Sequence, residues 1–121
     1  MGRTPTFDRT EVVRAAAAAF LDTGYEGTSV DDLVRCTGLH RGSLYQAFGS
    51  KRGLFVTALR ELDHPPTPAA LDLLLVATLE LAPRDDEVRG LVADVLARFD
   101  DPATVLGGRL LARAHLEKGP Q

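Results

Sequence analysis

Glycine and proline divide this chain of 121 residues into short segments, and each periodic segment has the spacing of an α-helix. No segment alternates apolar and polar residues over a useful length with the period of two that a half-buried β-strand needs. One segment has apolar residues at i, i+3, i+4, i+7, i+8 and i+11, namely Val88, Leu91, Val92, Val95, Leu96 and Phe99. The sequence therefore predicts an all-α fold.

Capping residues and glycines set the limits of four predicted helices in the first half. Asp8 can cap the first helix, and Gly24 can end it because glycine enters the left-handed conformation without strain. Thr28 or Ser29 can cap the second helix, which stops at Gly38. The first helix is expected over residues 9–22, and the second begins after Thr28 or Ser29 and stops at Gly38. The third and fourth are expected over 40–47 and 51–62.

Proline marks the predicted helices of the second half. Thr67-Pro68 and Asp101-Pro102 each combine a capping residue with proline at the first helical position. Proline also breaks the chain at His64-Pro65-Pro66, where we expect a domain boundary. The helices of this half are expected from Ala69 to Ala82, from Val88 to Phe99 and from Pro102 through about Glu117. The predicted parts are a domain of residues 1–50, a connecting helix of 51–62 and a short helical domain of 63–121.

The net charge of −3 hides an uneven distribution. Residues 1–62 hold eight basic and seven acidic side chains, whereas residues 63–121 hold six and ten. Residues 33–60 contain no acid, and their basic side chains are Arg35, Arg41, Lys51, Arg52 and Arg60. Such a window favours a polyanionic partner on one face. A chance gap among the surface acids gives the same pattern, and charge alone does not separate the two interpretations.

Two short helices joined by Thr37-Gly38-Leu39 have the pattern of a helix-turn-helix, whose second helix lies in the major groove of DNA. In that second helix, Leu44 and Phe48 are four residues apart on the core side. The side chains on its other faces are a guanidinium, a hydroxyl, a phenol and an amide, which bind phosphates and base edges. They belong to Arg41, Ser43, Tyr45 and Gln46.

Two further residues extend this candidate DNA-binding surface. Gly42 removes a side chain from the first turn and would let the backbone approach a groove wall closely. Lys51 begins the next helix, where its charge and the exposed backbone amides favour a phosphate. A solvated polar face is the alternative interpretation, but it does not explain the absence of acids from this window.

Three motifs over about residues 9–62, half of the chain, closely resemble the tetracycline-repressor (TetR) family with order and spacing intact. They are Gly24-Tyr25-Glu26-Gly27-Thr28-Ser29-Val30, then Gly38-Leu39-His40-Arg41-Gly42-Ser43-Leu44-Tyr45, and then Phe48-Gly49-Ser50-Lys51 with Leu54-Phe55. The resemblance implies a homodimeric transcriptional regulator, usually a repressor. Its paired third helices would read a palindromic operator in double-stranded DNA.

The resemblance also implies roles for single residues. Thr28, Ser29, Tyr45 and Lys51 would contact phosphates. Arg41, Gly42 and Ser43 would contact bases or backbone. Gln46 would make a variable base contact. His40 stands where the family usually has a serine or similar cap, so helix 40–47 is expected to be less well capped unless His40 itself meets DNA. Gly53 departs from the family by replacing a better helix former. Arg3 and Arg9 are further candidates on an N-terminal arm.

The helix from Ala69 to Ala82 is apolar almost all round, which predicts burial on more than one side. The few helices of this half can hardly surround it, so we expect a second subunit to cover the remainder. A monomeric core with some exposed leucines is the alternative. The short second half also argues against a large effector pocket inside one subunit, and it leaves a cleft between subunits open.

Enzymatic chemistry finds no support in the sequence. Gly38 separates Cys36 from His40, while His64 lies in a proline linker and His115 near the tail. No phosphate loop or metal cluster is present, so we predict no enzyme activity, catalytic residue, metal or cofactor. The longest nearly apolar stretch, residues 69–82, is too short to cross a bilayer, and we expect a cytoplasmic protein. The competing hypothesis is a protein-interaction module that forms heterodimers and binds no effector.

Overall fold

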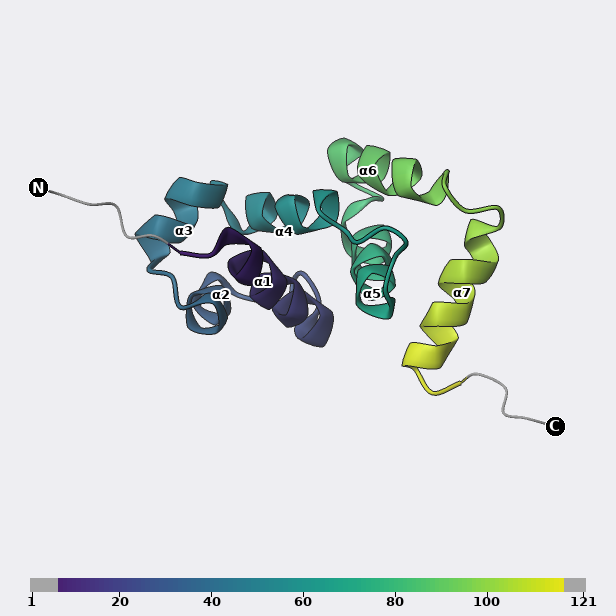
Figure 1. The fold of residues 1–121 in the computed structure, drawn as a ribbon, viewed down its shortest axis with the longest axis horizontal. Helices are drawn as coiled ribbons and strands as arrows, with labels where there is room; N and C mark the ends of the chain where they lie inside the picture. The colour runs from purple at the N-terminus through teal and green to yellow at the C-terminus, as the bar shows by residue number, and fades with distance from the viewer. Residues whose placement is uncertain (1–6, 117–121) are drawn as a thin grey trace, which may run out of the picture. The chain divides into compact units, whose positions relative to one another are not determined.

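The computed structural model describes residues 7–116, which form seven α-helices and one π-helical segment (Figure 1). Within these residues no β-strand occurs, and the all-α fold is confirmed. The elements are α1 (Arg9–Thr23), α2 (Val30–Thr37), α3 (Arg41–Phe48), α4 (Lys51–Arg60), α5 (Pro68–Val76), the π-helix η1 (Ala77–Leu81), α6 (Asp86–Leu96) and α7 (Pro102–Arg113).

The chain divides into two compact units, Met1–Ala58 and Leu59–Gln121. This division lies within α4, whereas the sequence suggested a boundary at His64-Pro65-Pro66. The first part of α4 is tied to the first unit because the Phe55 ring packs edge-on against two other rings. The centroid of the Phe55 ring lies 5.1 Å from that of the Phe20 ring and 5.2 Å from that of the Tyr25 ring.

The caps of α1 explain its limits. Asp8 accepts a hydrogen bond from the backbone N–H of Glu11 at 3.2 Å, which confirms the predicted N-cap. At the other end, Gly24 donates its backbone N–H to the Phe20 carbonyl at 2.8 Å. Gly24 has φ 80° and ψ 173°, so it needs the freedom of glycine. Its ψ is extended, however, and the predicted left-handed helical conformation is wrong there.

The turn between α2 and α3 has the geometry that the glycine predicts. Gly38 adopts the left-handed conformation, with φ 76° and ψ 2°, and its N–H donates to the Val34 carbonyl. His40 precedes α3 as its N-cap, and its side chain makes no capping hydrogen bond. The expected weakness of this cap is therefore confirmed.

The core of the first unit consists of fully buried apolar side chains from all four helices, namely Phe20, Leu33, Leu44, Leu54 and Phe55. Fully burying each such side chain contributes about 1.5–3 kcal/mol. The turn between α1 and α2 adds Tyr25, whose ring stacks on Phe20 at 5.8 Å. This core holds α2 and α3 as a fixed pair, which matters for any surface that they present.

In the second unit, the predicted helix over 69–82 is interrupted. It consists of α5 followed by the π-helix η1, in which the N–H of Ala82 bonds to the carbonyl of Ala77. The sequence gives no signal for this wider turn, which changes the direction of the side chains beyond it. Leu79 lies in η1 and is 66% exposed, in a segment whose apolar sequence predicted burial on more than one side.

The last two helices end earlier than the sequence suggests. After Leu96 the N–H groups of Arg98 and Phe99 bond to carbonyls three residues back, so α6 gives way to turns. In the same way α7 ends at Arg113, and His115 adopts a positive φ of 60°. The predicted continuation to Glu117 is wrong over 114–116, and Glu117 itself lies outside the described residues.

A buried carboxylate ties α5 to α7 in the second unit. Asp72 accepts hydrogen bonds from Arg109 Nε at 2.6 Å and Nη2 at 3.0 Å, and it pairs with Arg113 Nη1 at 2.9 Å. Burial alone would raise the pKa of Asp72, but the hydrogen bonds and charges of both arginines outweigh it and lower the pKa. No local sequence pattern indicated this cluster, because its members lie far apart in the chain.

Candidate nucleic-acid interface

The two sides of α3 differ in the way that the sequence suggests. Leu44 is fully buried and anchors the helix, whereas Arg41, Gly42, Tyr45 and Gln46 are exposed. Ser43 is half-buried. Phe48 is half-buried as well, so it belongs only in part to the core side. The helix therefore offers a guanidinium, a phenol and an amide to a partner.

Gly42 lies on this exposed face, and a Cβ atom placed there would meet open space. Internal packing therefore does not require glycine at this position. Gly53 is different, because a Cβ atom there would lie 1.8 Å from the Phe48 carbonyl oxygen. The departure from a better helix former at Gly53 is thus explained by the close approach of the backbone.

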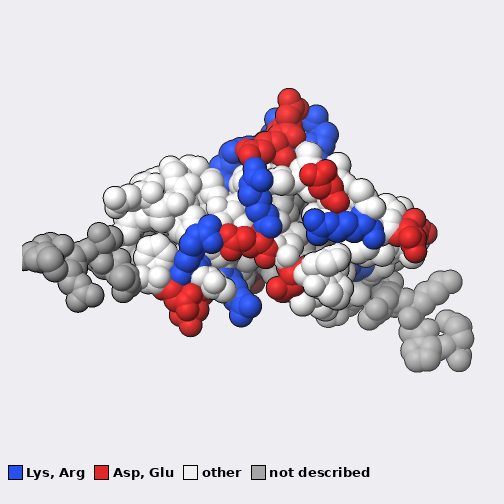
Figure 2. Space-filling view, turned by 45° about the horizontal axis from the view of Figure 1, so that its top comes forward, with Lys and Arg blue, Asp and Glu red and all other residues white. Residues whose placement is uncertain are grey.

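Acidic side chains accompany the basic ones on the face shown in Figure 2. The acid-free window of the sequence does not remain free of acids in space. Arg41 pairs with Asp31, and Arg35 pairs with Asp32, both acids of the first turn of α2. Because these acids precede the window in the sequence, counting charges along the chain could not reveal them. The acid-free window of the sequence therefore does not form an acid-free surface in the folded chain.

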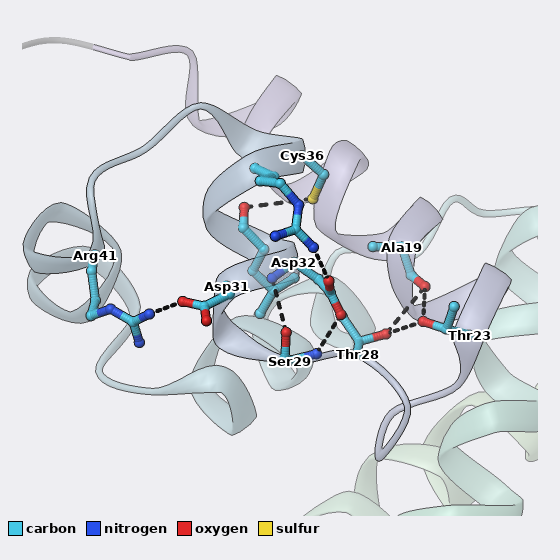
Figure 3. Close-up of polar contacts among 10 residues, drawn as sticks. Ala19, Thr23, Thr28, Ser29, Asp31, Asp32, Cys36 and Arg41 are labelled. Carbon is cyan, nitrogen blue, oxygen red and sulfur yellow. Dashed lines mark hydrogen bonds and ion pairs between the residues drawn. The ribbon is translucent and has the colours of Figure 1, made fainter.

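Thr28 occupies the interior of the domain (Figure 3). Its side chain is 0% exposed, and its hydroxyl lies 2.6 Å from the Gly24 carbonyl and 3.2 Å from that of Ala19. It also lies 2.6 Å from the hydroxyl of Thr23. The Thr28 side chain thus fastens the end of α1 to the start of α2. The expected phosphate contact of this side chain does not fit its position.

Ser29 caps α2 and remains exposed (Figure 3). Its hydroxyl accepts from the Asp32 N–H at 3.0 Å, and the Asp32 carboxylate accepts from the Ser29 N–H at 2.8 Å. These bonds, with the charge of Arg35, hold the pKa of Asp32 below its usual value. A hydroxyl that accepts one bond can still donate its own proton. Ser29 therefore keeps a donor for an outside oxygen.

Lys51 is engaged with the turn between α1 and α2. Its Nζ donates to the carbonyls of Tyr25 at 3.0 Å and Thr28 at 3.2 Å, and it lies 4.2 Å from the centre of the Tyr25 ring. An ammonium has three donors, so one remains beyond these two bonds. The position of Lys51 makes it a support for the start of α2, which the sequence did not indicate.

Of the two candidate DNA contacts on the N-terminal arm, Arg9 lies within the described residues and Arg3 does not. Arg9 is the first residue of α1, and its guanidinium lies 5.9 Å from the centre of the Phe48 ring. It is therefore part of the folded unit. Arg3 lies outside the described residues.

Cys36 borders a shallow alanine-rich hollow between α1 and α2. Its thiol lies 3.6 Å from the Leu33 carbonyl, and burial raises its pKa. A raised pKa lowers the thiolate fraction, which makes a reactive cysteine less favourable. Among residues 7–116, no group of three or more His, Cys, Asp or Glu side chains is arranged to hold a metal ion. No helix in that range is long and apolar enough to span a membrane.

Comparison with known proteins points to regulators of transcription. The uncharacterized HTH-type transcriptional regulator YezE of Bacillus subtilis (strain 168) is 39% identical over 74 residues, which make up 61% of this chain and 38% of that protein. The HTH-type transcriptional repressor AcnR of Corynebacterium glutamicum is 40% identical over 60 residues, or 50% of this chain and 32% of that protein. The HTH-type transcriptional repressor ComR of Escherichia coli (strain K12) is 43% identical over 64 residues, or 52% and 30%.

The matched region thus spans only 30 to 38% of the length of these relatives. No solved structure matched the chain. The family model described as bacterial regulatory proteins, tetR family, matches residues 12–58. Those residues contain α2, the glycine turn and α3, the pair whose geometry is that of a helix-turn-helix. Over these residues, which are less than half of the chain, it is similar to the tetR family of bacterial regulatory proteins.

Proposed function

We propose that this chain is a sequence-specific DNA-binding regulator of transcription that acts as a homodimeric repressor. The observation that carries the proposal is the asymmetry of α3. Leu44 anchors the helix in the core, while Arg41, Tyr45 and Gln46 remain exposed and carry groups that bind phosphates and base edges. A helix fixed in this manner can enter the major groove without reorganising the domain. Its site of action would be the cytoplasm, where bacterial DNA lies.

The proposed contacts differ from those expected from the sequence in two places. Thr28 is left out, because its buried hydroxyl already has partners inside the domain. Lys51 acts mainly by holding the turn before α2, and its remaining donor can meet a phosphate. The other residues remain proposed DNA contacts. Ser29 and Tyr45 bind phosphate, Gln46 contacts a base, and Arg41, Gly42 and Ser43 contact bases or backbone, with His40 beside them at the start of α3.

The proposed dimer uses the apolar face of α7. No residue of this helix is buried, and Leu110 and Leu111 are 44% and 46% exposed. Neighbouring exposed leucines are typical of a surface that another protein covers. A second copy would cover them and supply the second α3 that a palindromic operator requires.

An effector site inside one copy is not part of this proposal. A hollow in the second unit, bordered by Leu74, Val95 and Phe99, has a volume of about 200 Å³. Pockets for small molecules usually measure about 300–1,000 Å³. The regulator is therefore proposed to bind its operator without a ligand in this hollow.

The exposed leucines of α7 also suit a second candidate function, a module that forms heterodimers with another regulator. The two functions differ in what the purified chain does alone. A homodimeric repressor binds specific DNA by itself, whereas a heterodimerisation module binds DNA specifically only with its partner.

Binding to the DNA that flanks the gene of this chain tests the proposal. Fluorescence anisotropy at moderate salt should give a lower Kd for one flanking segment than for a scrambled duplex. Tyr45→Ala should weaken binding to both duplexes, and Gln46→Ala should change the preference between operators. Cys36→Ser, on α2 away from the proposed contacts, is the matched control and should bind like the wild type. Equal affinity of the wild type for every duplex would refute the proposal.

A further inference from the structure

The ion pair between Asp31 and Arg41 lies on the surface that the proposed function assigns to DNA (Figure 3). We infer that Asp31 is a positioning residue, which orients the Arg41 guanidinium toward a guanine of the operator. This inference rests on the proposed function and adds to it a chemical preference, a guanine at the position that Arg41 reaches.

The geometry connects the two helices of the helix-turn-helix. Asp31 belongs to the first turn of α2, and Arg41 is the first residue of α3. Their contact joins Oδ1 of Asp31 to Nη2 of Arg41. Both side chains remain accessible, at 68% for Asp31 and 51% for Arg41. The pair is therefore open to a partner that approaches the exposed face of α3.

The contact uses only a small part of the guanidinium. Arginine carries five N–H donors in a planar fork, and Asp31 engages one nitrogen of that fork. The remaining donors are enough for a bidentate contact with O6 and N7 of guanine, the usual arginine contact in the major groove. A carboxylate that binds one nitrogen of the guanidinium limits the rotamers of the arginine side chain before DNA binds. Less conformational entropy is therefore lost on binding.

The position of the acid is otherwise unfavourable for binding DNA. A negative side chain beside the proposed interface repels phosphates and lowers the affinity for every sequence. An exposed pair of this kind also contributes little to the stability of the fold. The positive end of α2 favours an acid in the first turn, where Asp31 lies. Asp31 thus lowers the affinity for DNA of any sequence, while it favours the duplex in which Arg41 contacts its guanine.

The experiment begins with the 121-residue chain and a library of random-sequence DNA duplexes. Selection by the wild type yields an enriched duplex, and single base-pair substitutions then locate the guanine that depends on Arg41. For the wild type, replacing that guanine should raise Kd by about 5- to 150-fold, the range for a bidentate base contact. Arg41→Lys should lose most of this discrimination, because lysine keeps the charge and lacks the fork.

Asp31→Asn is the decisive variant. It should reduce the discrimination at that guanine to less than about threefold, while Kd for a scrambled duplex stays equal or falls. In the Arg41→Lys background the same change should leave the discrimination unaltered. Asp22→Asn, which removes an equal charge from the exposed last turn of α1, is the matched control and should keep the guanine preference.

The outcomes separate this inference from the function beneath it. If the wild type enriches a sequence and Asp31→Asn keeps the full guanine preference, the role of Asp31 is refuted and the regulator stands. An equal gain in affinity for enriched and scrambled duplexes would also refute it, because it would mean that Asp31 acts by charge alone. If the wild type enriches no sequence, the proposed function fails and this inference fails with it. Unfolding temperatures within a few degrees of the wild type should accompany each variant.

Discussion

The ammonium group of Lys51 lies 4.2 Å from the centre of the Tyr25 ring and donates a hydrogen bond to the Tyr25 carbonyl at 3.0 Å. With its second bond, to Thr28 at 3.2 Å, Lys51 fastens the start of α4 to the turn that precedes α2. The same turn leads directly into Ser29, the exposed cap of α2. Lys51 can therefore affect DNA binding without being mainly a DNA contact.

Replacement of Lys51 by alanine should lower both the stability of the first unit and its affinity for DNA. Loss of two hydrogen bonds from a charged donor should cost on the order of 1–2 kcal/mol in the free energy of unfolding. Chemical denaturation without DNA measures this change, with Tyr45→Ala as the control. Unchanged stability of Lys51→Ala, with a shallower salt dependence of binding, would show that Lys51 acts only on phosphate.

Gly42 and Gly53 should respond in opposite ways to alanine. Gly53→Ala should lower stability by about 1–3 kcal/mol, because its Cβ would lie 1.8 Å from the Phe48 carbonyl oxygen. Gly42→Ala should keep or raise stability, because the position is open and alanine favours helix by about 1 kcal/mol. We nevertheless expect Gly42→Ala to weaken DNA binding by blocking close approach of α3. Thermal unfolding and anisotropy measure the two effects, and full DNA affinity of Gly42→Ala would contradict the proposed approach.

Asp72 should make the second unit sensitive to acid. Its pKa is lowered in the folded chain, so its contribution to stability is complete above the unfolded value of about 3.9 and is lost as the pH falls through the lower folded pKa. Asp72→Asn should destabilise the fold at pH 7 by about 1–3 kcal/mol, because Arg109 and Arg113 lose their common acceptor. Thermal unfolding from pH 7 to pH 3 should show a smaller loss for this variant than for the wild type. Parallel pH profiles would contradict the role of Asp72.

The exposed leucines of α7 should control assembly. Leu111→Glu places a charge on the proposed apolar interface and should shift the chain from dimer to monomer at micromolar concentration. Ala103→Glu, on the exposed first turn of the same helix, is the matched control and should leave the dimer intact. Sedimentation velocity distinguishes these states. A wild-type chain that sediments as a monomer would rule out the homodimer.

Local patterns predicted the helices and the helix-turn-helix of this chain well, because caps and glycines act within a few residues. Asp8 and Gly38 have the roles that their neighbours suggest, and Leu44 is buried as its spacing requires. Thr28 shows the limit of this approach. A polar residue in a motif can face outward or satisfy buried carbonyls, and only the packed structure distinguishes the two.

Pairings between distant residues were not accessible from the sequence. Asp31 meets Arg41 across the glycine turn, and Asp72 meets Arg109 from another helix. Such contacts depend on how the helices pack, and neither the periodicity of apolar residues nor a count of charges along the chain reports that packing. The capping box of Ser29 and Asp32 is different, since their spacing of three residues is a local signal that could have indicated it.

Selection of DNA duplexes from a random library by the purified wild-type chain tests the central claim most directly. A homodimer that reads DNA with α3 should enrich a two-fold symmetric sequence. Its half-sites should lie about one helical turn apart, or a multiple of about 10 base pairs. Gln46→Ala should then change the enriched bases within each half-site. Failure of the wild type to enrich any sequence at moderate salt would contradict the claim that this chain is a sequence-specific regulator.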